Sequence, residues 1–268
     1  MIERVLLSLA AYKALHLHDV LNYNKFNHYA ITHHSTTIEG GTLTEIDTQL
    51  LLDEGITPKG KPLEHSLMVK DHYEALQFVL KAVENKTAIS PLFIRQINAK
   101  VMRGTGSVYQ TVFGEIDASQ GVFRKGNVSA GGTYFVNYDK VEPLTTKLCN
   151  EINKALLLAD TVEKQLKLYF TAHFQLVSIH PFYDGNGRTS RLLMNYLQQY
   201  FSLPLAIVFK EDKAEYFTAL TEARKKEDVT IFQNFMFQQY AKYLDQHVAE
   251  YKKITDNKDG GSLFSFAF

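Results

Sequence analysis

The stretch that most constrains the fold is residues 180–191, which read His-Pro-Phe-Tyr-Asp-Gly-Asn-Gly-Arg-Thr-Ser-Arg. Before it, residues 161–179 carry the strongest helical pattern in the chain, with apolar side chains at three- and four-residue spacing. Pro181 cannot continue that helix, and a second helical run follows as far as Phe201. The sequence therefore predicts two helices that are joined by a tight polar turn.

The turn has the features of an anion site. Glycine adopts positive φ angles at little steric cost, so the N–H groups of Gly185, Asn186 and Gly187 can point into one hollow. The first turn of the following helix adds unpaired N–H groups and a partial positive charge. Arg188 and Arg191 are three residues apart, so they share one helix face and can both reach phosphate oxygens.

Two further side chains add reactive groups to this turn. Asp184 offers a hard oxygen ligand that suits magnesium held against phosphates. His180 has the ordinary pKa that suits proton transfer near neutrality. The whole stretch resembles the signature of the Fic family, His-x-Phe-x-Asp/Glu-Gly-Asn-Gly-Arg-x-x-Arg, at every fixed position. Over roughly residues 30–245 this resemblance implies a mostly α fold, a Fic-type helical bundle with one β-hairpin called the flap.

The resemblance also implies an activity. Most characterised Fic enzymes transfer AMP from ATP to a hydroxyl of a target protein, so we expect a protein adenylyltransferase that uses ATP and Mg²⁺. In that scheme His180 takes the proton from a Ser, Thr or Tyr hydroxyl, and Asp184 holds the magnesium ion. The phosphates would be bound by Gly185, Asn186, Gly187, Arg188 and Arg191, the last of these on the γ-phosphate.

A second motif lies near the N-terminus. Residues 35–40, Ser-Thr-Thr-Ile-Glu-Gly, fit a short helix with Ser35 as its cap and Gly40 or Gly41 at its end. They resemble the inhibitory motif of one Fic class, Ser/Thr-x-x-x-Glu-Gly/Asn. In that class Glu39 would pair with Arg191 and so prevent Arg191 from binding the γ-phosphate. The pairing is physically reasonable, because a carboxylate can accept two hydrogen bonds from one guanidinium group. The motif would sit in an N-terminal helical region, residues 1–88.

The middle of the chain carries a hairpin pattern. Residues 127–130 and 133–136 have strand character and flank Gly131-Gly132. In Fic proteins the flap here holds the target side chain over the active site, and its backbone can pair with an extended target segment. The resemblance assigns target docking to Val128, Gly131, Gly132 and Tyr134. Upstream, Gly121-Val122-Phe123-Arg124 matches the Gly-x-x-Arg step of the family.

The rest of the chain reads as helices around this centre. A catalytic core over 89–245 would contain the flap at about 121–137. A C-terminal tail, 246–268, is polar and then aromatic, with Leu263, Phe264, Phe266 and Phe268. Helical patterns cover 45–52, 67–83, 90–104, 141–159, 213–226 and 231–244. At Asp71 and Asn98 Fic proteins often carry Asn and His, and we expect neither position to belong to the reaction centre.

Composition excludes several function classes. Lys plus Arg equals Asp plus Glu at 29 each, which argues against a broad nucleic-acid footprint. The single cysteine, Cys149, cannot form an internal disulfide, so a cytoplasmic location is the default, with Cys149 as a small buried residue. No apolar run is long enough for a membrane span. Five histidines precede residue 40, and we expect them at the surface or at helix caps.

Alternatives remain open at this stage. A hydrolase that removes AMP from a modified protein would use the same residues, with Glu39 serving that direction. A Fic-type phosphotransferase is disfavoured, because that variant usually has Lys in place of the second glycine, here Gly187. A non-enzymatic alternative is a nucleotide-binding regulatory module, which would tolerate loss of His180 or Asp184. Self-modification and a homodimer are further partner relations that the sequence leaves open.

Overall fold

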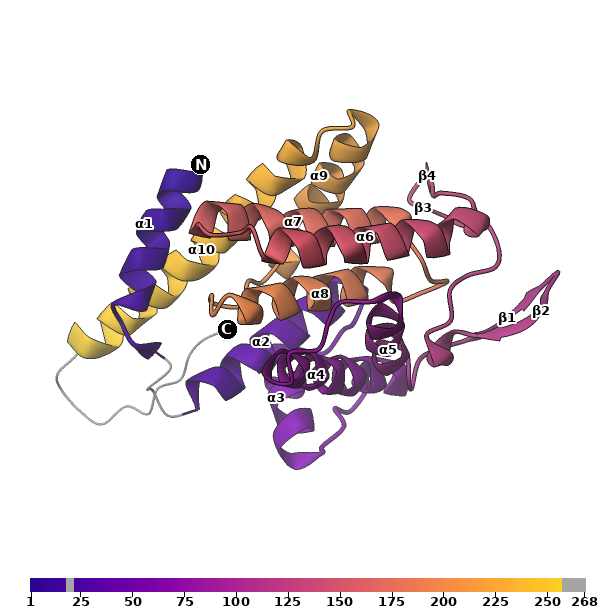
Figure 1. Cartoon of the computed structure of the whole chain (residues 1–268). Helices are drawn as coiled ribbons and strands as arrows, with labels where there is room; N and C mark the ends of the chain where they lie inside the picture. The colour runs from indigo at the N-terminus through magenta and orange to yellow at the C-terminus, as the bar shows by residue number, and fades with distance from the viewer. Residues whose placement is uncertain (18–21, 257–268) are drawn as a thin grey trace.

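The computed structural model describes residues 1–17 and 22–256 and is mostly helical within them (Figure 1). The described helices are α1 (Ile2–Lys13), α2 (Tyr23–Ile38), α3 (Glu45–Glu54), α4 (Leu63–Glu84), α5 (Pro91–Val101), α6 (Val141–Leu156), α7 (Val162–Ile179), α8 (Asn186–Tyr200), α9 (Lys213–Lys225) and α10 (Val229–Asp256). Two antiparallel hairpins pair β1 (Val108–Thr111) with β2 (Gly114–Asp117) and β3 (Ser129–Ala130) with β4 (Thr133–Tyr134). The short 3-10 helices are η2 (Ala118–Gln120), η3 (Tyr138–Lys140) and η4 (Lys210–Asp212).

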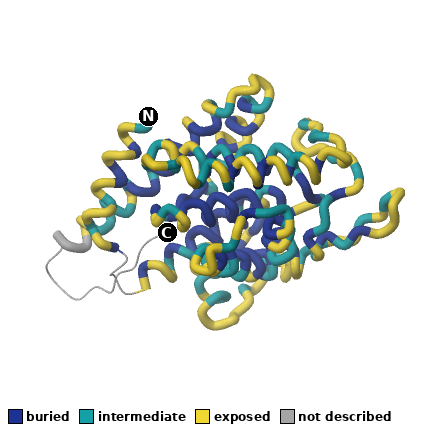
Figure 2. Tube along the Cα trace, in the orientation of Figure 1, coloured by how far each residue is buried: buried dark blue, intermediate teal, exposed yellow. Residues whose placement is uncertain are grey.

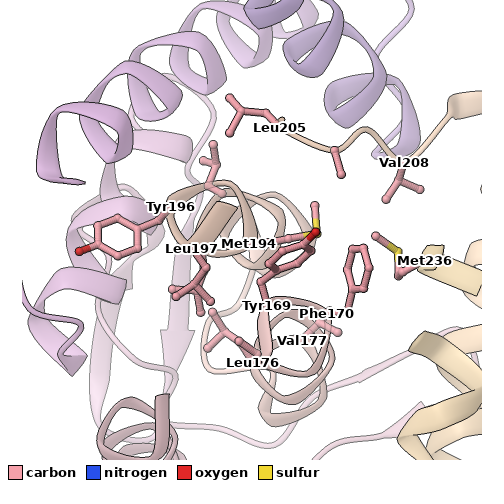
Figure 3. Close-up of a cluster of buried hydrophobic side chains, with 14 of the residues drawn as sticks. Tyr169, Phe170, Leu176, Val177, Met194, Tyr196, Leu197, Leu205, Val208 and Met236 are labelled. Carbon is pink, nitrogen blue, oxygen red and sulfur yellow. The ribbon is translucent and has the colours of Figure 1, made fainter. Parts of the chain in front are cut away.

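Helix α8 lies at the centre of the fold. Every residue from 188 to 198 is buried, and α7, α4, α5 and α2 all pack against the helix. Figure 2 shows the buried residues gathered in the middle of the molecule, with exposed residues on the outer helices and on both hairpins. Side chains of α7 and α8, such as Leu176 and Leu197, meet in the core (Figure 3). A helix that is polar at its first turn and buried on all sides thus brings its N-terminus to a protected site.

Local sequence signals set the helix ends. Ser90 caps α5, with its Oγ accepting from the N–H of Phe93 at 3.1 Å, and Pro91 is the first helical residue. Thr161 caps α7 in the same way, and Thr44 forms a capping box with Asp47. Each of these caps lies at or directly before the start of a helical pattern in the sequence, so the positions of α3, α5 and α7 follow from local chemistry.

The sequence predicts one hairpin, and the structure contains two. The flap has the expected form: Gly131 and Gly132 both have positive φ, 55° and 76°, between paired strands, as a two-residue type I′ turn requires. The unexpected hairpin is β1–β2, which projects from the helical body (Figure 1). Its strands are four residues long and largely exposed, so they leave no clear alternation of apolar and polar residues to detect.

The inhibitory segment is part of a longer helix than predicted. Ser35 does not cap a short helix, because α2 begins at Tyr23 and Ser35 lies buried within its last turns. The predicted end is confirmed, since Glu39 is the C-cap residue and Gly40 follows with a φ of 101°. The early turns of α2 escaped detection because many polar residues of the helix, such as Asn27, Thr32 and His33, are buried, which hides the amphipathic pattern.

The predicted regions share one hydrophobic core. Val5 and Ile31, from the N-terminal region, belong to the same buried cluster as Leu192 and Tyr240. Helix α10 continues to Asp256 alongside α1, so the predicted tail boundary at 246 falls inside a helix. His18 and the apolar tail residues Leu263, Phe264, Phe266 and Phe268 lie outside the described residues. Within residues 1–17 and 22–256, no helix is both long and apolar enough to cross a membrane.

Candidate active site

The candidate base, His180, lies at the C-terminal end of α7. It adopts the left-handed conformation, with φ 53° and ψ 61°, which a non-glycine residue keeps only when its surroundings hold it. Its N–H donates to the carbonyl of Leu176 at 3.1 Å, which ends the helix. Its ring Nδ1 lies 3.4 Å from the carbonyl oxygen of Val177, a long contact. The backbone of His180 is therefore better fixed than its ring.

Arg124 fixes that backbone. Its buried guanidinium donates to the carbonyl of His180 at 2.8 Å and to Gly126 and Val136, at the two ends of the flap, at 2.8 and 2.5 Å. Its own N–H donates to the carbonyl of Pro181 at 2.9 Å. One side chain thus ties the flap to the base. The Gly-x-x-Arg match pointed to Arg124 without giving it this role.

Buried side chains hold the turn between α7 and α8 in place. Asn186 closes it by accepting from the N–H of Phe182 and donating to the Phe182 carbonyl, both at 2.9 Å. Asn98 of α5 donates to the carbonyl of Asp184 at 3.0 Å and contacts Thr189 at 3.2 Å. The expectation that Asn98 stands apart from the reaction centre is therefore wrong in part, because its side chain supports the turn directly. Gly185 has φ 76° and lies so close to Asn98 that an added Cβ would collide with the amide.

Arg188 is a buried cation with free donors. Its side chain is 2% exposed, and its Nε and Nη1 atoms have no hydrogen-bond partner. Its Nη2 lies 3.2 Å from the sulfur of Met102 and 3.5 Å from the carboxylate of Asp184, which is itself exposed. A buried guanidinium group normally donates its N–H groups to hydrogen-bond acceptors. The unpaired donors at the start of α8 therefore mark a place where an anion fits.

Arg191 is engaged by the end of helix α2. Its Nη2 donates to Glu39 Oε1 at 2.6 Å and to the carbonyl of Ser35 at 3.0 Å, and its Nε donates to Ser35 Oγ at 2.8 Å. On the other side, its Nη1 is 3.5 Å from the hydroxyl of Tyr216, which in turn meets His173 Nε2 at 2.8 Å. The predicted pairing of Glu39 with Arg191 is present in this geometry, and Ser35 adds two contacts that the sequence did not predict.

Glu39 also fills the start of α8. A Cβ added to Gly187 would collide with Glu39 Oε1, so the carboxylate rests directly on this glycine. Burial works to raise the pKa of Glu39, but the Arg191 and Arg188 guanidiniums outweigh it and hold the pKa below its usual value. The carboxylate is therefore charged at neutral pH and lies where the sequence places a bound anion.

The flap lies over the base. Phe135, directly after β4, stacks on the His180 ring with centroids 3.8 Å apart and planes 15° apart. Burial lowers the pKa of His180 to about 4, so the imidazole is neutral at physiological pH and can accept a proton. Tyr134 is 89% exposed at the outer face of the flap. Val128 is partly buried, and its carbonyl accepts from the N–H of Phe135 at 3.3 Å.

The comparisons with known proteins agree with this geometry. Residues 88–198 match the family model described as Fic/DOC family. This part of the chain belongs to the Fic/DOC family. Among curated relatives, the protein adenylyltransferases Fic of Drosophila erecta and Drosophila grimshawi are 28% and 29% identical to it over 217 and 218 residues. Each alignment covers 81% of this chain, which spans only 41% and 42% of the length of those relatives.

Solved Fic structures share the fold well beyond the matched segment. A Fic domain containing signaling protein from Bacteroides thetaiotaomicron aligns with a TM-score of 0.79 and 21% identity, over 93% of this chain and 98% of that one. Fic-1 from C. elegans aligns with a TM-score of 0.75 and 22% identity, over 96% of this chain and 73% of that one. The N-terminal helices are thus part of a fold seen in other Fic proteins.

The sequence misjudged two of the N-terminal histidines, whereas His16 is exposed as expected. His33 and His34 are 2% and 4% exposed, not at the surface or at caps, because Lys210 supplies their partners from far along the chain. The Lys210 ammonium lies 2.8 Å from His33 Nε2, and its backbone N–H donates to His34 Nδ1 at 3.1 Å. Cys149 is buried on α6 as expected, and burial raises the pKa of its thiol to about 12.

Proposed function

We propose that this chain is a protein adenylyltransferase that its own Glu39 holds inactive. The names of the curated relatives support the reaction, and the site supplies its parts. The observation that carries the proposal is the start of α8, where Arg188 has unpaired donors and Glu39 occupies the adjoining hollow over Gly187. A site built for phosphates, with a carboxylate of the same chain lying in it, fits an inhibited nucleotide-dependent enzyme.

The reaction follows from the groups in place. The neutral imidazole of His180 accepts the proton of a target hydroxyl as the hydroxyl oxygen forms a bond to the α-phosphorus of ATP. The bond between that phosphorus and the oxygen bridging to the β-phosphate breaks, and pyrophosphate leaves. The product is a phosphodiester between AMP and the target side chain. A positioned base of this kind typically contributes about 10²–10⁴-fold to a rate.

Phosphate binding falls to the first turn of α8. The N–H groups of Gly185, Asn186 and Gly187 and the Arg188 side chain would surround the phosphates, with Arg191 on the γ-phosphate. These donors are fixed before the substrate arrives, so they stabilise charge without reorganising. Arg191 can do this only after Glu39 has left it, because its donors already serve Glu39 and Ser35.

Asp184 fits a magnesium ligand. Its carboxylate is exposed beside the Arg188 guanidinium, and Mg²⁺ bound to a nucleotide usually takes one or two carboxylates together with phosphate oxygens. Among residues 1–17 and 22–256, no three acidic, His or Cys side chains gather closely enough to hold a metal ion alone. A bound Mg²⁺ would neutralise phosphate charge there, so Asp184 would act jointly with the nucleotide.

The flap would receive the target protein. Its strands end in an exposed turn at Gly131 and Gly132, and Tyr134 points away from the core at 89% exposure. The edge groups near Val128 can pair with an extended segment that carries the hydroxyl. The target side chain would then enter beside His180, next to Phe135.

The decisive experiment removes the inhibitory carboxylate. With magnesium and labelled ATP, the Glu39→Gly chain is expected to incorporate at least about 10-fold more AMP than the unchanged chain, since a misplacement of about 1 Å can cost on the order of 10²-fold in rate. Intact mass identifies AMP or phosphate as the added group, both on the chain itself and on proteins of a lysate. The matched control is Glu39→Gly with Arg191→Ala, which should lose the gain.

Two outcomes would contradict the proposal. If the Glu39→Gly chain modifies no protein faster than the unchanged chain does, Glu39 has no inhibitory role. If Glu39→Gly instead loses the ability to strip AMP from a previously modified protein, Glu39 belongs to a hydrolytic reaction, and the transferase direction is the wrong one.

A further inference from the structure

The ring of His180 has an unusual neighbour. A general base is normally oriented by a hydrogen bond from its second ring nitrogen to a carboxylate or a carbonyl. In His180 that contact is the 3.4 Å approach of Nδ1 to the Val177 carbonyl, which is long for a hydrogen bond. The close contact is instead with Phe135, whose ring lies 3.8 Å away and nearly parallel. The face of the imidazole is therefore held by an aromatic ring of the flap.

Phe135 has a second neighbour in the helical body. The guanidinium carbon of Arg224, on α9, lies 5.4 Å from the centre of the Phe135 ring, within the range of a cation–π contact. Arg224 Nε donates to Ser178 Oγ at 3.0 Å, two residues before His180. The flap ring thus contacts both α9, through Arg224, and the end of α7, through His180.

The Phe135 ring covers the His180 ring, and side chains of both charges act on the pKa of His180. Burial is the main reason that the pKa of His180 falls to about 4. The charged groups that act on it are Arg224 from α9, Arg124 before the flap and Glu39 from the end of α2; the two arginines lower the pKa and Glu39 raises it. Phe135 is the apolar part of this cover, and it belongs to the flap, directly after β4.

We propose that Phe135 is the positioning residue of the base: its ring orients the His180 imidazole and shields it from water, so that a closed flap and a competent base are one state. This rests on the proposed function, because His180 is the base of that reaction. The consequence is that a target which closes the flap also completes the base, while an open flap leaves the imidazole solvated and free to turn.

The experiment reads the His180 ring directly. In the full-length Glu39→Gly chain with ¹⁵N-labelled histidine, the titration of His180 is followed by NMR and assigned by comparison with His180→Gln. Phe135→Ala is expected to move the midpoint up by at least one pH unit, toward the ordinary value of about 6.5. Phe135→Tyr keeps the ring and should keep the midpoint. The matched control is Tyr134→Ala, the neighbouring flap residue whose ring does not stack on His180.

Transfer rates supply the second readout. At pH 8, where His180 is neutral in every variant, Phe135→Ala should reduce kcat for AMP transfer about 10-fold or more through lost orientation. The deficit should grow as the pH falls toward 6, with KM for ATP unchanged. Phe135→Leu, which keeps an apolar side chain without a flat face, replaces Phe135→Ala if that variant does not fold, and should move both readouts in the same direction.

The two proposals fail in different ways. An unchanged titration of His180 in Phe135→Ala and Phe135→Leu, or an equal shift in Tyr134→Ala, overturns the positioning role whatever the chain catalyses. Absence of AMP transfer by the Glu39→Gly chain overturns the proposed function, while the titration still reports on the stack.

Discussion

At the scale of single residues, the site is a set of charges that compete for the same partners. Arg191 gives its donors to Glu39 and Ser35, while Arg188, three residues earlier, keeps two nitrogens unpaired in a buried place. Leaving buried donors unpaired costs free energy, roughly 1–3 kcal/mol each. Unpaired donors next to a helix N-terminus are what the proposed phosphate site requires, since the phosphates would supply the missing acceptors.

The first prediction concerns His180. In the Glu39→Gly background, His180→Ala should reduce AMP transfer by about 10²–10⁴-fold, because the proton acceptor is lost. Binding of ATP should change little, since the phosphates are held by α8. Incorporation of labelled AMP and calorimetry with ATP measure the two effects. Transfer that persists at the parent rate would remove His180 from the mechanism, and a loss of ATP binding would show that its role is structural.

At the scale of elements, helix α2 is held from two sides. On the inner side Arg191 contacts Ser35 and Glu39, and on the outer side the Lys210 ammonium lies 2.8 Å from His33 Nε2 and 3.0 Å from Glu45 Oε1. Lys210 belongs to η4, so the loop after α8 fixes the same helix whose end occupies the start of α8. The outer contacts do not touch Arg191, yet they fix the helix whose C-cap residue is Glu39.

The second prediction tests that outer contact. Lys210→Met removes the ammonium and weakens the hold on α2 by about 1 kcal/mol, the upper range for a partly exposed ion pair. With Glu39 present, AMP transfer should rise about 5-fold, and amide exchange over residues 29–40 should quicken. In the Glu39→Gly background the same change should give no further gain.

Lys226→Met is the control for Lys210→Met. Lys226 pairs with Glu222 at 3.1 Å on the exposed face of α9, so its loss removes an ion pair without contact to α2. Two results would show that Lys210 does not contribute to inhibition. One is an equal gain in AMP transfer from Lys226→Met, and the other is a gain from Lys210→Met that persists in the Glu39→Gly background.

At the scale of the whole molecule, the core contains several neutral histidines. Burial lowers the pKa of His28 and His33 to about 4, and of His34 and His173 to about 3. The unfolded chain protonates histidine near pH 6.5, so between pH 6.5 and about 4 it binds more protons than the folded chain does. The stability that these groups contribute is present above pH 6.5 and is lost as the pH falls toward 4.

The third prediction follows from that sign. Between pH 7.5 and pH 5, the free energy of unfolding should fall by several kcal/mol, because each such histidine contributes about 1.4 kcal/mol for every pH unit below 6.5. Denaturant unfolding at both pH values measures the change. His28→Gln removes one of these groups, far from the signature turn, and should flatten the dependence. If the free energy of unfolding does not change between the two pH values, these histidines are not neutral in the folded chain.

The sequence alone determined the elements that local chemistry specifies. The caps at Thr44, Ser90 and Thr161 begin their helices where the side chains predict, and the Gly131-Gly132 turn forms the expected hairpin. Such features depend on a few adjacent residues, because a side-chain oxygen near its own backbone, or a glycine at positive φ, acts over a short range. The signature turn belongs to the same class, since its glycines and its two arginines lie close together in the sequence, between residues 185 and 191 at the start of α8.

Only the tertiary structure decided which distant groups meet. Phe135 on the His180 ring, Lys210 between His33 and Glu45, and Arg124 on the carbonyl of His180 all join segments separated by dozens of residues. Nothing local marks Phe135 or Lys210, and the Gly-x-x-Arg match marks Arg124 without its partner, because these contacts form only when the helices have packed around α8. The same packing turned His33 and His34 from expected surface residues into buried ones, since the energy of burying a polar group depends on a partner that the sequence places elsewhere.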